Sequence, residues 1–252
     1  MKKYKNIYIN GCSFTAGHTL EEKDTWPELL SKKLNLQKIN NSINGQSFDS
    51  IFTNTIAHLS NLDSNDTLVV IGNTWPTRYS IPFKNLNVNI TPADIWPLKG
   101  EPKSSFSDKL HTNRLVSPYD MNLDWEIQKQ YLDDEGNSTN LKKGLDKVCM
   151  SFVNFYQNLI KYDNDWEKNQ KLYNYAKLLA LKSFLEVNKF NYRIVDFIVP
   201  KDNSEVFDVD KLYNDDNYVY FGTKWRDKYV DGHPTAEGCI NVSEVLYDSF
   251  NR

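Results

Sequence analysis

Five residues of the chain carry groups that together could perform acyl transfer: Ser13, Gly45, Asn73, Asp231 and His233. A serine hydroxyl can attack an ester carbonyl if an imidazole takes its proton and a carboxylate orients the imidazole. Backbone N–H groups and a side-chain amide can stabilise the negative charge that develops on the carbonyl oxygen. These residue types therefore predict serine-based ester chemistry, provided that the fold brings them together.

Each of the five residues has an expected role in such a site. Ser13 is the candidate nucleophile, His233 the base and Asp231 the residue that orients the imidazole. The N–H groups of Ser13 and Gly45 and the amide of Asn73 would form the oxyanion hole. Asp231 precedes His233 by only two positions, so Asp227 or a main-chain carbonyl is the alternative partner of the ring.

The apolar pattern places three of these residues directly after β-strands. Strands are expected at residues 6–10, 38–42, 67–71 and 192–199, and helices at 26–34, 48–59, 145–159, 166–187 and 235–250. The run TLVVI at 67–71 is typical of a strand that is buried on both faces of a parallel sheet. Ligands of such sheets bind at the carboxyl ends of the strands, which is where Ser13, Gly45 and Asn73 lie.

Residues 76–140 interrupt this alternation of strands and helices. The segment is rich in proline and aromatic residues and has no sustained periodicity, which predicts an insertion over the rim of a single domain that spans residues 1–252. Exposed aromatic side chains there would suit a sugar or an acyl chain, and Arg78 could pair with an anionic substrate group.

Composition excludes several classes of partner. The 30 Lys and Arg residues against 33 Asp and Glu residues give a formal net charge of −3, which argues against nucleic acid. The apolar runs are too short for a membrane span, and the first ten residues alternate like a strand rather than a signal peptide. Three cysteines, at no metal-ligand spacing, favour free thiols, a cytoplasmic location and no metal site.

The chain resembles the SGNH hydrolases, also called the GDSL esterase/lipase family, in four blocks that occur in the family's order. The blocks are GCSFT at 11–15, NSING at 41–45, VVIGNT at 69–74 and DGHP at 231–234. Cys12 stands where the family usually has Asp, Asn73 follows Gly72 without the usual intervening residue, and the Asp-to-His spacing is one residue shorter than usual.

The resemblance implies a three-layer α/β/α fold of flavodoxin-like type and a serine esterase or acyltransferase without metal or organic cofactor. By family analogy and from the aromatic insertion, the expected substrate is a small-molecule or carbohydrate ester, most of all an O-acetyl ester on a sugar. The acyl group could pass to water or to another hydroxyl.

Other functions fit parts of the sequence. The segment SFTAGHT loosely resembles the phosphate loop of flavodoxin-like proteins, which would make the chain a binding module for a phosphate-bearing or sugar ligand. An SGNH-like protein that binds its ligand without turning it over is a second alternative. Cys12 could itself be the nucleophile, although a cysteine beside a strand end is more often a small buried apolar residue.

Overall fold

A five-stranded parallel sheet forms the centre of the computed structural model, in the order β2-β1-β3-β7-β8. The strands are β1 (Asn6–Asn10), β2 (Gln37–Asn40), β3 (Thr67–Gly72), β7 (Asn191–Asp196) and β8 (Tyr218–Tyr220). The structure describes residues 4–17, 20–76, 78–83, 86–90, 111–114, 162–197, 215–221, 229–230 and 233–251, with isolated positions between 147 and 159.

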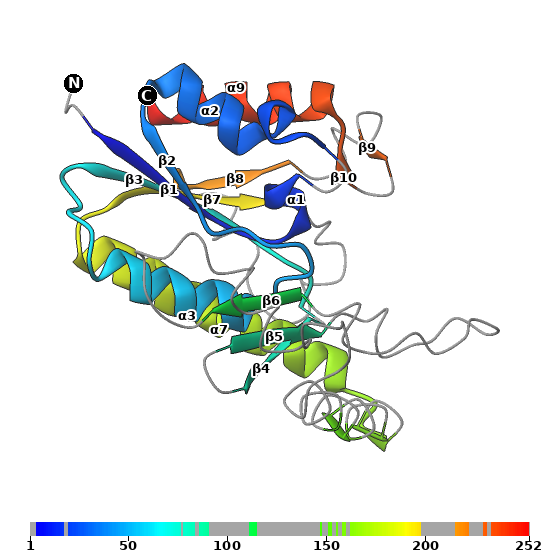
Figure 1. The fold of residues 1–252 in the computed structure, drawn as a ribbon. Helices are drawn as coiled ribbons and strands as arrows, with labels where there is room; N and C mark the ends of the chain where they lie inside the picture. Colours follow the sequence, from blue (N-terminus) through cyan, green and yellow to red (C-terminus); the bar gives the residue numbers. More distant parts are fainter. Residues whose placement is uncertain are drawn as a thin grey trace, which may run out of the picture.

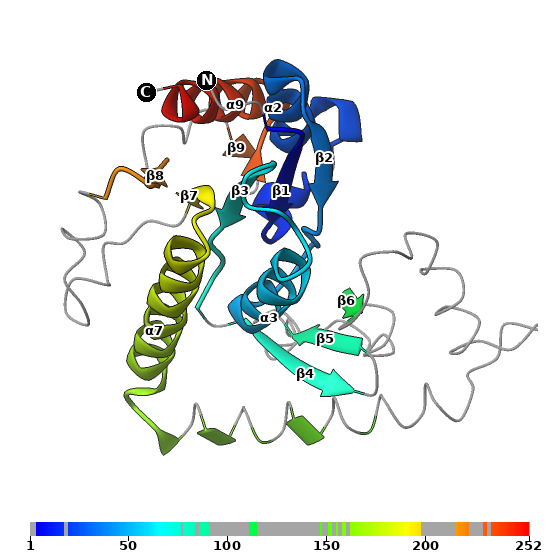
Figure 2. The ribbon, with the colours of Figure 1, turned by 90° about the vertical axis from the view of Figure 1, so that its left-hand side faces the viewer.

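Two pairs of helices cover the two faces of this sheet. One face carries α2 (Trp26–Leu34) and α9 (Ala236–Phe250), and the other carries α3 (Phe48–Leu59) and α7 (Trp166–Val187) (Figure 1). Figure 2 shows the same layers after a quarter turn, with the strands between the two helix pairs. The predicted three-layer α/β/α fold is therefore confirmed.

Side chains of the central strands alternate between two apolar cores. Ile7 and Ile9 of β1 pack on the side of α2 and α9, whereas Tyr8 packs on the side of α3 and α7. In β3, Val70 packs on the side of α2 and α9 and Val69 on the side of α3 and α7. All six residues of that strand are buried. A strand that is covered on both faces needs apolar residues at every position, which accounts for the run TLVVIG.

Short elements connect the sheet to the helices at the carboxyl ends of the strands. The sequence predicted a turn after β1, but the chain forms one helical turn there, α1 (Ser13–Ala16), which ends at Gly17 with a positive φ of 81°. The 3₁₀ turn η1 (Glu22–Asp24) then leads into α2. Pro27 lies in the first turn of α2, where its missing N–H costs no helical hydrogen bond.

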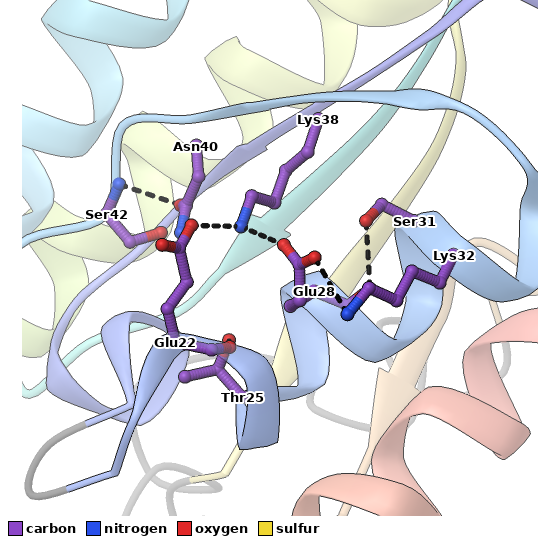
Figure 3. A network of polar contacts seen from close by, with 8 residues as sticks. All are labelled: Glu22, Thr25, Glu28, Ser31, Lys32, Lys38, Asn40 and Ser42. Atoms are coloured by element: carbon purple, nitrogen blue, oxygen red, sulfur yellow. Dashed lines mark hydrogen bonds and ion pairs between the residues drawn. The ribbon is translucent and has the colours of Figure 1, made fainter.

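An ion-pair network fastens the edge strand β2 to the segment that follows α1 (Figure 3). Lys38 Nζ lies 2.6 Å from Glu22 Oε1 and also pairs with Glu28, whose other oxygen lies 3.2 Å from Lys32 Nζ. The hydrogen bond from Lys38 lowers the pKa of Glu28 despite partial burial. Burial alone would lower the pKa of Lys38, but hydrogen bonds to Glu22 and Glu28 raise it.

Smaller sheets lie outside the three layers. An antiparallel sheet joins β4 (Tyr79–Phe83), β5 (Leu86–Ile90) and β6 (His111–Arg114), and β9 (Tyr229–Val230) pairs with β10 (His233–Pro234). The sequence showed no periodicity at β4–β6, and it predicted an irregular segment at β8, so these strands were missed. Most of 76–140, and most of the helix expected at 145–159, lie outside the described residues. None of the helices described is long and apolar enough to cross a bilayer.

Candidate active site

Ser13 and His233 meet at the carboxyl end of the sheet. Ser13 is the first residue of α1, directly beyond β1, and His233 lies in β10, just before α9. The Nε2 atom of His233 is 2.7 Å from the Oγ atom of Ser13. The fold thus brings together two residues that are 220 positions apart in the chain.

A row of stacked rings holds the imidazole of His233. Its ring lies on that of Phe14, with centroids 4.8 Å apart and an angle of 25° between the planes. Phe14 stacks in turn on Phe197, and Phe197 on Phe221, at 5.7 Å and 5.3 Å. Phe197 follows β7 and Phe221 follows β8, so the row connects the imidazole to the ends of two strands.

Two backbone N–H groups at the carboxyl ends of β1 and β2, those of Ser13 and Gly45, have no acceptor among the described residues. The N–H of Ser13 belongs to the first turn of α1, where helical geometry offers no partner. Gly45 adopts a positive φ of 76° in the loop after β2, and Ile43 of that loop donates its N–H to the Gly11 carbonyl at 3.2 Å. Within the described part of the chain, neither the Ser13 nor the Gly45 N–H donates to a protein oxygen.

Asn73 lies at the same rim, but its side chain is already engaged. Its Nδ2 donates to Asp196 Oδ2 at 3.1 Å, and its Oδ1 accepts the N–H of Thr74 at 2.9 Å. Asp196, at the end of β7, is 5% exposed and also accepts the Tyr218 hydroxyl. An amide NH₂ has two hydrogens, so one Nδ2 hydrogen remains for an oxyanion.

Hydrogen bonds tie the loops after β2 and β3 together. The hydroxyl of Thr74 donates to the Gln46 carbonyl at 2.9 Å and accepts from Arg78 Nη1 at 3.0 Å. Gln46 Oε1 also accepts the Ile43 N–H at 3.1 Å. These bonds connect the neighbours of Gly45 and Asn73 directly to each other.

Close backbone packing fixes α1 against the sheet. A Cβ atom added to Gly11 or to Gly72 would lie 2.2 Å from Thr15 Oγ1, and the one on Gly11 only 3.2 Å from the Gly72 Cα. The Thr15 side chain thus occupies the space that two missing Cβ atoms leave. Thr15 is 0% exposed and lies on the same helical turn as Ser13.

The described cysteines are not placed as nucleophiles. Cys12 is 0% exposed, and its thiol donates to the Asn73 carbonyl at 3.7 Å. Burial raises the pKa of the Cys239 thiol to about 11. Both are buried free thiols, which agrees with the expectation that Cys12 packs as a small apolar residue. Cys149 lies outside the described residues.

Asp231 and Asp227 also lie outside the described residues, so the orienting carboxylate stays a prediction. Among the residues that the structure does describe, no cluster of His, Cys, Asp and Glu could hold a metal ion.

Sequence reasoning missed Asp196 and the ring of Phe14. A signal existed for Asp196, because an aspartate interrupts the otherwise apolar end of the predicted strand YRIVDFIV. A buried carboxylate at a strand end needs hydrogen-bond donors, and in an α/β sheet these come from neighbouring strand ends. No comparable signal marked Phe14, since one aromatic residue beside the serine is also typical of ordinary core packing.

Solved structures of similar fold were found for nearly the whole chain. The matched proteins are GDSL lipolytic proteins and esterases. A member of the lipolytic G-D-S-L family from Veillonella parvula has 11% identity over 98% of this chain and 99% of that one, with a TM-score of 0.47. The psychrotrophic esterase EstA from Pseudoalteromonas sp. has 13% identity over 98% and 97%, also at 0.47.

A third similar structure is an acetyl xylan esterase, Est2A, from the rumen bacterium Butyrivibrio proteoclasticus. It has 10% identity over 99% of this chain and 64% of that one, with a TM-score of 0.44. No protein-family model matches the sequence, and no curated protein matches it.

Proposed function

We propose that the protein is a serine esterase that cleaves, or transfers, a small acyl group from an oxygen ester. The observation that carries this proposal is the distance of 2.7 Å between His233 Nε2 and Ser13 Oγ. At that distance a neutral imidazole can take the hydroxyl proton as the ester is attacked. The open N–H groups of Ser13 and Gly45 meet the second requirement, which is a set of donors for the oxyanion.

The proposed reaction begins when Ser13 Oγ attacks the carbonyl carbon and its proton moves to His233 Nε2. The carbonyl π electrons move to the oxygen, whose negative charge is stabilised by the N–H groups of Ser13 and Gly45 and by Asn73 Nδ2. When the tetrahedral intermediate collapses, the bond to the alcohol oxygen breaks and that oxygen takes the proton from His233. The acyl group is then an ester of Ser13.

The second half of the reaction releases the acyl group. Water gives a proton to His233 Nε2 and attacks the acyl carbon, and the proton returns to Ser13 Oγ as the acid leaves. A sugar hydroxyl in place of water would turn the same step into a transfer. In this proposal the Asp231 carboxylate accepts a hydrogen bond from the imidazole N–H that faces away from Ser13, and Asp227 is the alternative acceptor.

For the substrate we propose an O-acetyl ester on a carbohydrate or another small molecule in the cytoplasm. Ser13 is only 4% exposed, so a small acyl group fits the approach to its hydroxyl. Trp75, two residues after Asn73, is 45% exposed, and its indole offers a flat apolar face with a polar edge to a sugar ring.

The test combines turnover with covalent labelling. We expect the wild-type protein to hydrolyse p-nitrophenyl acetate and to react with a fluorophosphonate probe, and Ser13→Ala to lose both properties. Ser31→Ala removes another buried serine hydroxyl, on α2, and is the matched control that keeps both. An unlabelled wild-type protein, or unchanged turnover in Ser13→Ala, would contradict the serine mechanism and favour a binding module.

A further inference from the structure

Arg78 lies at the rim of the candidate site and has no acidic partner among the residues that the structure describes. A turn from Trp75, closed by the Arg78 N–H on the Trp75 carbonyl at 3.2 Å and with Pro76 at its second position, brings the side chain back toward Thr74. Its Nη1 donates to Thr74 Oγ1 at 3.0 Å. The guanidinium is therefore bound to the residue next to Asn73.

The same contact places Arg78 close to the loop that carries Gly45. Thr74 Oγ1 donates to the carbonyl of Gln46, which directly follows Gly45. The N–H of Thr74 donates to Asn73 Oδ1. Thr74 thus connects Arg78 to Asn73 and to Gln46, the residue that follows Gly45.

The hydrogen bonding of Arg78 is incomplete. A guanidinium has five N–H groups, and the Nε of Arg78 is buried and has no acceptor among the described residues. An ionised donor that is buried and unpaired is costly, so such groups usually have acceptors. Among the described residues, no carboxylate forms an ion pair with Arg78.

Four other partly buried cations of the described residues have their donors bonded to protein oxygens. Lys38, Lys177 and Lys182 each pair with at least one carboxylate. Arg193, which has no such pair, bonds to main-chain and side-chain oxygens of its surroundings through three of its nitrogens. Arg78 differs from all four, and it differs at the proposed site.

We propose that Arg78 binds an anionic group of the substrate, a carboxylate or a phosphate, beside the ester that Ser13 attacks. This inference rests on the proposed esterase function and narrows its substrate class to acyl esters that carry a negative charge. The planar fork of a guanidinium matches the oxygens of such groups and can give two parallel hydrogen bonds. The carboxylate of Asp196, which binds Asn73, would repel an anion that came close to it, whereas the Arg78 guanidinium would attract one.

The experiment compares matched esters that differ in one charge. 3-Acetoxybenzoate and 3-acetoxybenzamide place the charge, or its neutral substitute, on the alcohol side of the ester. The 4-nitrophenyl monoesters of succinate and succinamate place it on the acyl side, and 3-acetoxyphenyl phosphate tells phosphate from carboxylate. For each pair, the measured quantity is the ratio of kcat/KM for the anionic ester to kcat/KM for the neutral ester.

Arg78→Gln should lower this ratio by about tenfold or more in at least one pair, as expected for the loss of a charge-assisted hydrogen bond. Arg78→Lys, which keeps the charge but not the fork, should retain part of the preference. Lys33→Gln removes the same charge from exposed α2 and is the control for net charge. The proposal is overturned if Arg78→Gln keeps this ratio within about twofold of the wild-type ratio in all pairs. It is also overturned if Lys33→Gln changes the ratio as much as Arg78→Gln does.

A binding measurement separates this proposal from the esterase itself. If no ester is turned over and Ser13 is not labelled, the proposed function fails, but calorimetric binding of 3-hydroxybenzoate and 3-hydroxybenzamide still tests the anion site. Tighter binding of the benzoate to the wild-type protein, lost in Arg78→Gln, supports the site. Equal binding of the two compounds to the wild-type protein overturns the anion site. This outcome needs no variant, so it decides the question even if Arg78→Gln does not fold.

Discussion

The imidazole of His233 stacks on the ring of Phe14, the residue that directly follows Ser13 in the chain. One turn of helix therefore carries both the candidate nucleophile and the ring surface against which the candidate base lies. Since a proton moves between Ser13 Oγ and His233 Nε2, a small rotation of the imidazole would lengthen their 2.7 Å contact. We infer that Phe14 positions His233.

Phe14→Leu should therefore lower kcat more than it lowers stability. Leucine keeps an apolar side chain in the core but offers no flat face, so the imidazole can rotate away from Ser13. We expect kcat for p-nitrophenyl acetate to fall about tenfold or more, with a loss of about 1 kcal/mol in the free energy of unfolding. Phe221→Leu changes a ring that stacks on Phe197, at the far end of the row. It should cost similar stability and leave kcat near wild type; equal kcat losses in the two variants would contradict a positioning role for Phe14.

Asn73 should depend on Asp196 for its contribution to the rate. Asn73→Ala removes a donor from the proposed oxyanion hole and should lower kcat about 10²-fold. The Asp196 carboxylate also accepts a hydrogen bond from the Tyr218 hydroxyl, so Asp196 is tested in the Tyr218→Phe background, where that second bond is already absent. Tyr218→Phe should reduce stability with little change in kcat, and adding Asp196→Leu should lower kcat about tenfold by freeing the Asn73 amide. If the double variant has the kcat of Tyr218→Phe, Asp196 does not position Asn73.

The fold was predictable where local sequence determines it. The apolar run at 67–71 identified β3 (Thr67–Gly72), because a strand between two helix layers must be apolar at every position. β8 (Tyr218–Tyr220) was missed because a strand of three residues among Asn and Asp has too short a pattern. Its extended backbone depends on pairing with β7, which is a tertiary contact.

The candidate site was predictable to the extent that it consists of strand ends. Ser13, Gly45 and Asn73 follow adjacent strands, and the topology of a parallel sheet is enough to bring them to one rim. Contacts between side chains were not predictable. The bond from Asn73 to Asp196 requires that β7 lies next to β3, and the stack of Phe14 on Phe197 requires the tilt of both rings. Strand order and ring orientation arise from global packing, which a local pattern does not contain.

The pairing of Lys38 with Glu28 should make stability depend on pH. Lys38→Met leaves two carboxylates without their buried partner and should cost about 1–2 kcal/mol at pH 7. The lowered pKa of Glu28 gives stability that is present above the unfolded pKa, about 4, and lost as the pH falls through the folded value. The raised pKa of Lys38 gives stability that is lost as the pH rises through its folded value, above 10.5. Urea unfolding at several pH values should therefore show a difference between wild type and Lys38→Met that is constant near neutrality and shrinks below about pH 4.

Lys32→Met is the matched control for this ion pair. Lys32 contacts the same glutamate at 3.2 Å, but its side chain is 63% exposed, whereas that of Lys38 is 14% exposed. An exposed pair contributes little, so Lys32→Met should cost at most about 0.5 kcal/mol. Equal losses in the two variants would mean that burial of Lys38 is irrelevant to the pairing.

The packing of Thr15 between two glycines gives a test of how α1 is held in place. Gly72→Ala places a Cβ 2.2 Å from Thr15 Oγ1 but 3.4 Å from Thr15 Cβ, so only the outer part of the threonine obstructs it. We expect a loss of about 1–3 kcal/mol in the free energy of unfolding and a lower kcat, because Thr15 lies on the helical turn of Ser13. Thr15→Ala removes the obstructing oxygen, which has no hydrogen-bond partner in the described part of the chain, and should restore both properties in the Gly72→Ala background. In Gly11→Ala the new Cβ lies 2.8 Å from Thr15 Cβ itself, so Thr15→Ala should not rescue that variant. Rescue of neither variant would show that the backbone rather than the Thr15 side chain limits the space between β1, β3 and α1, and rescue of both would show that Thr15 Cβ does not obstruct a Cβ on Gly11.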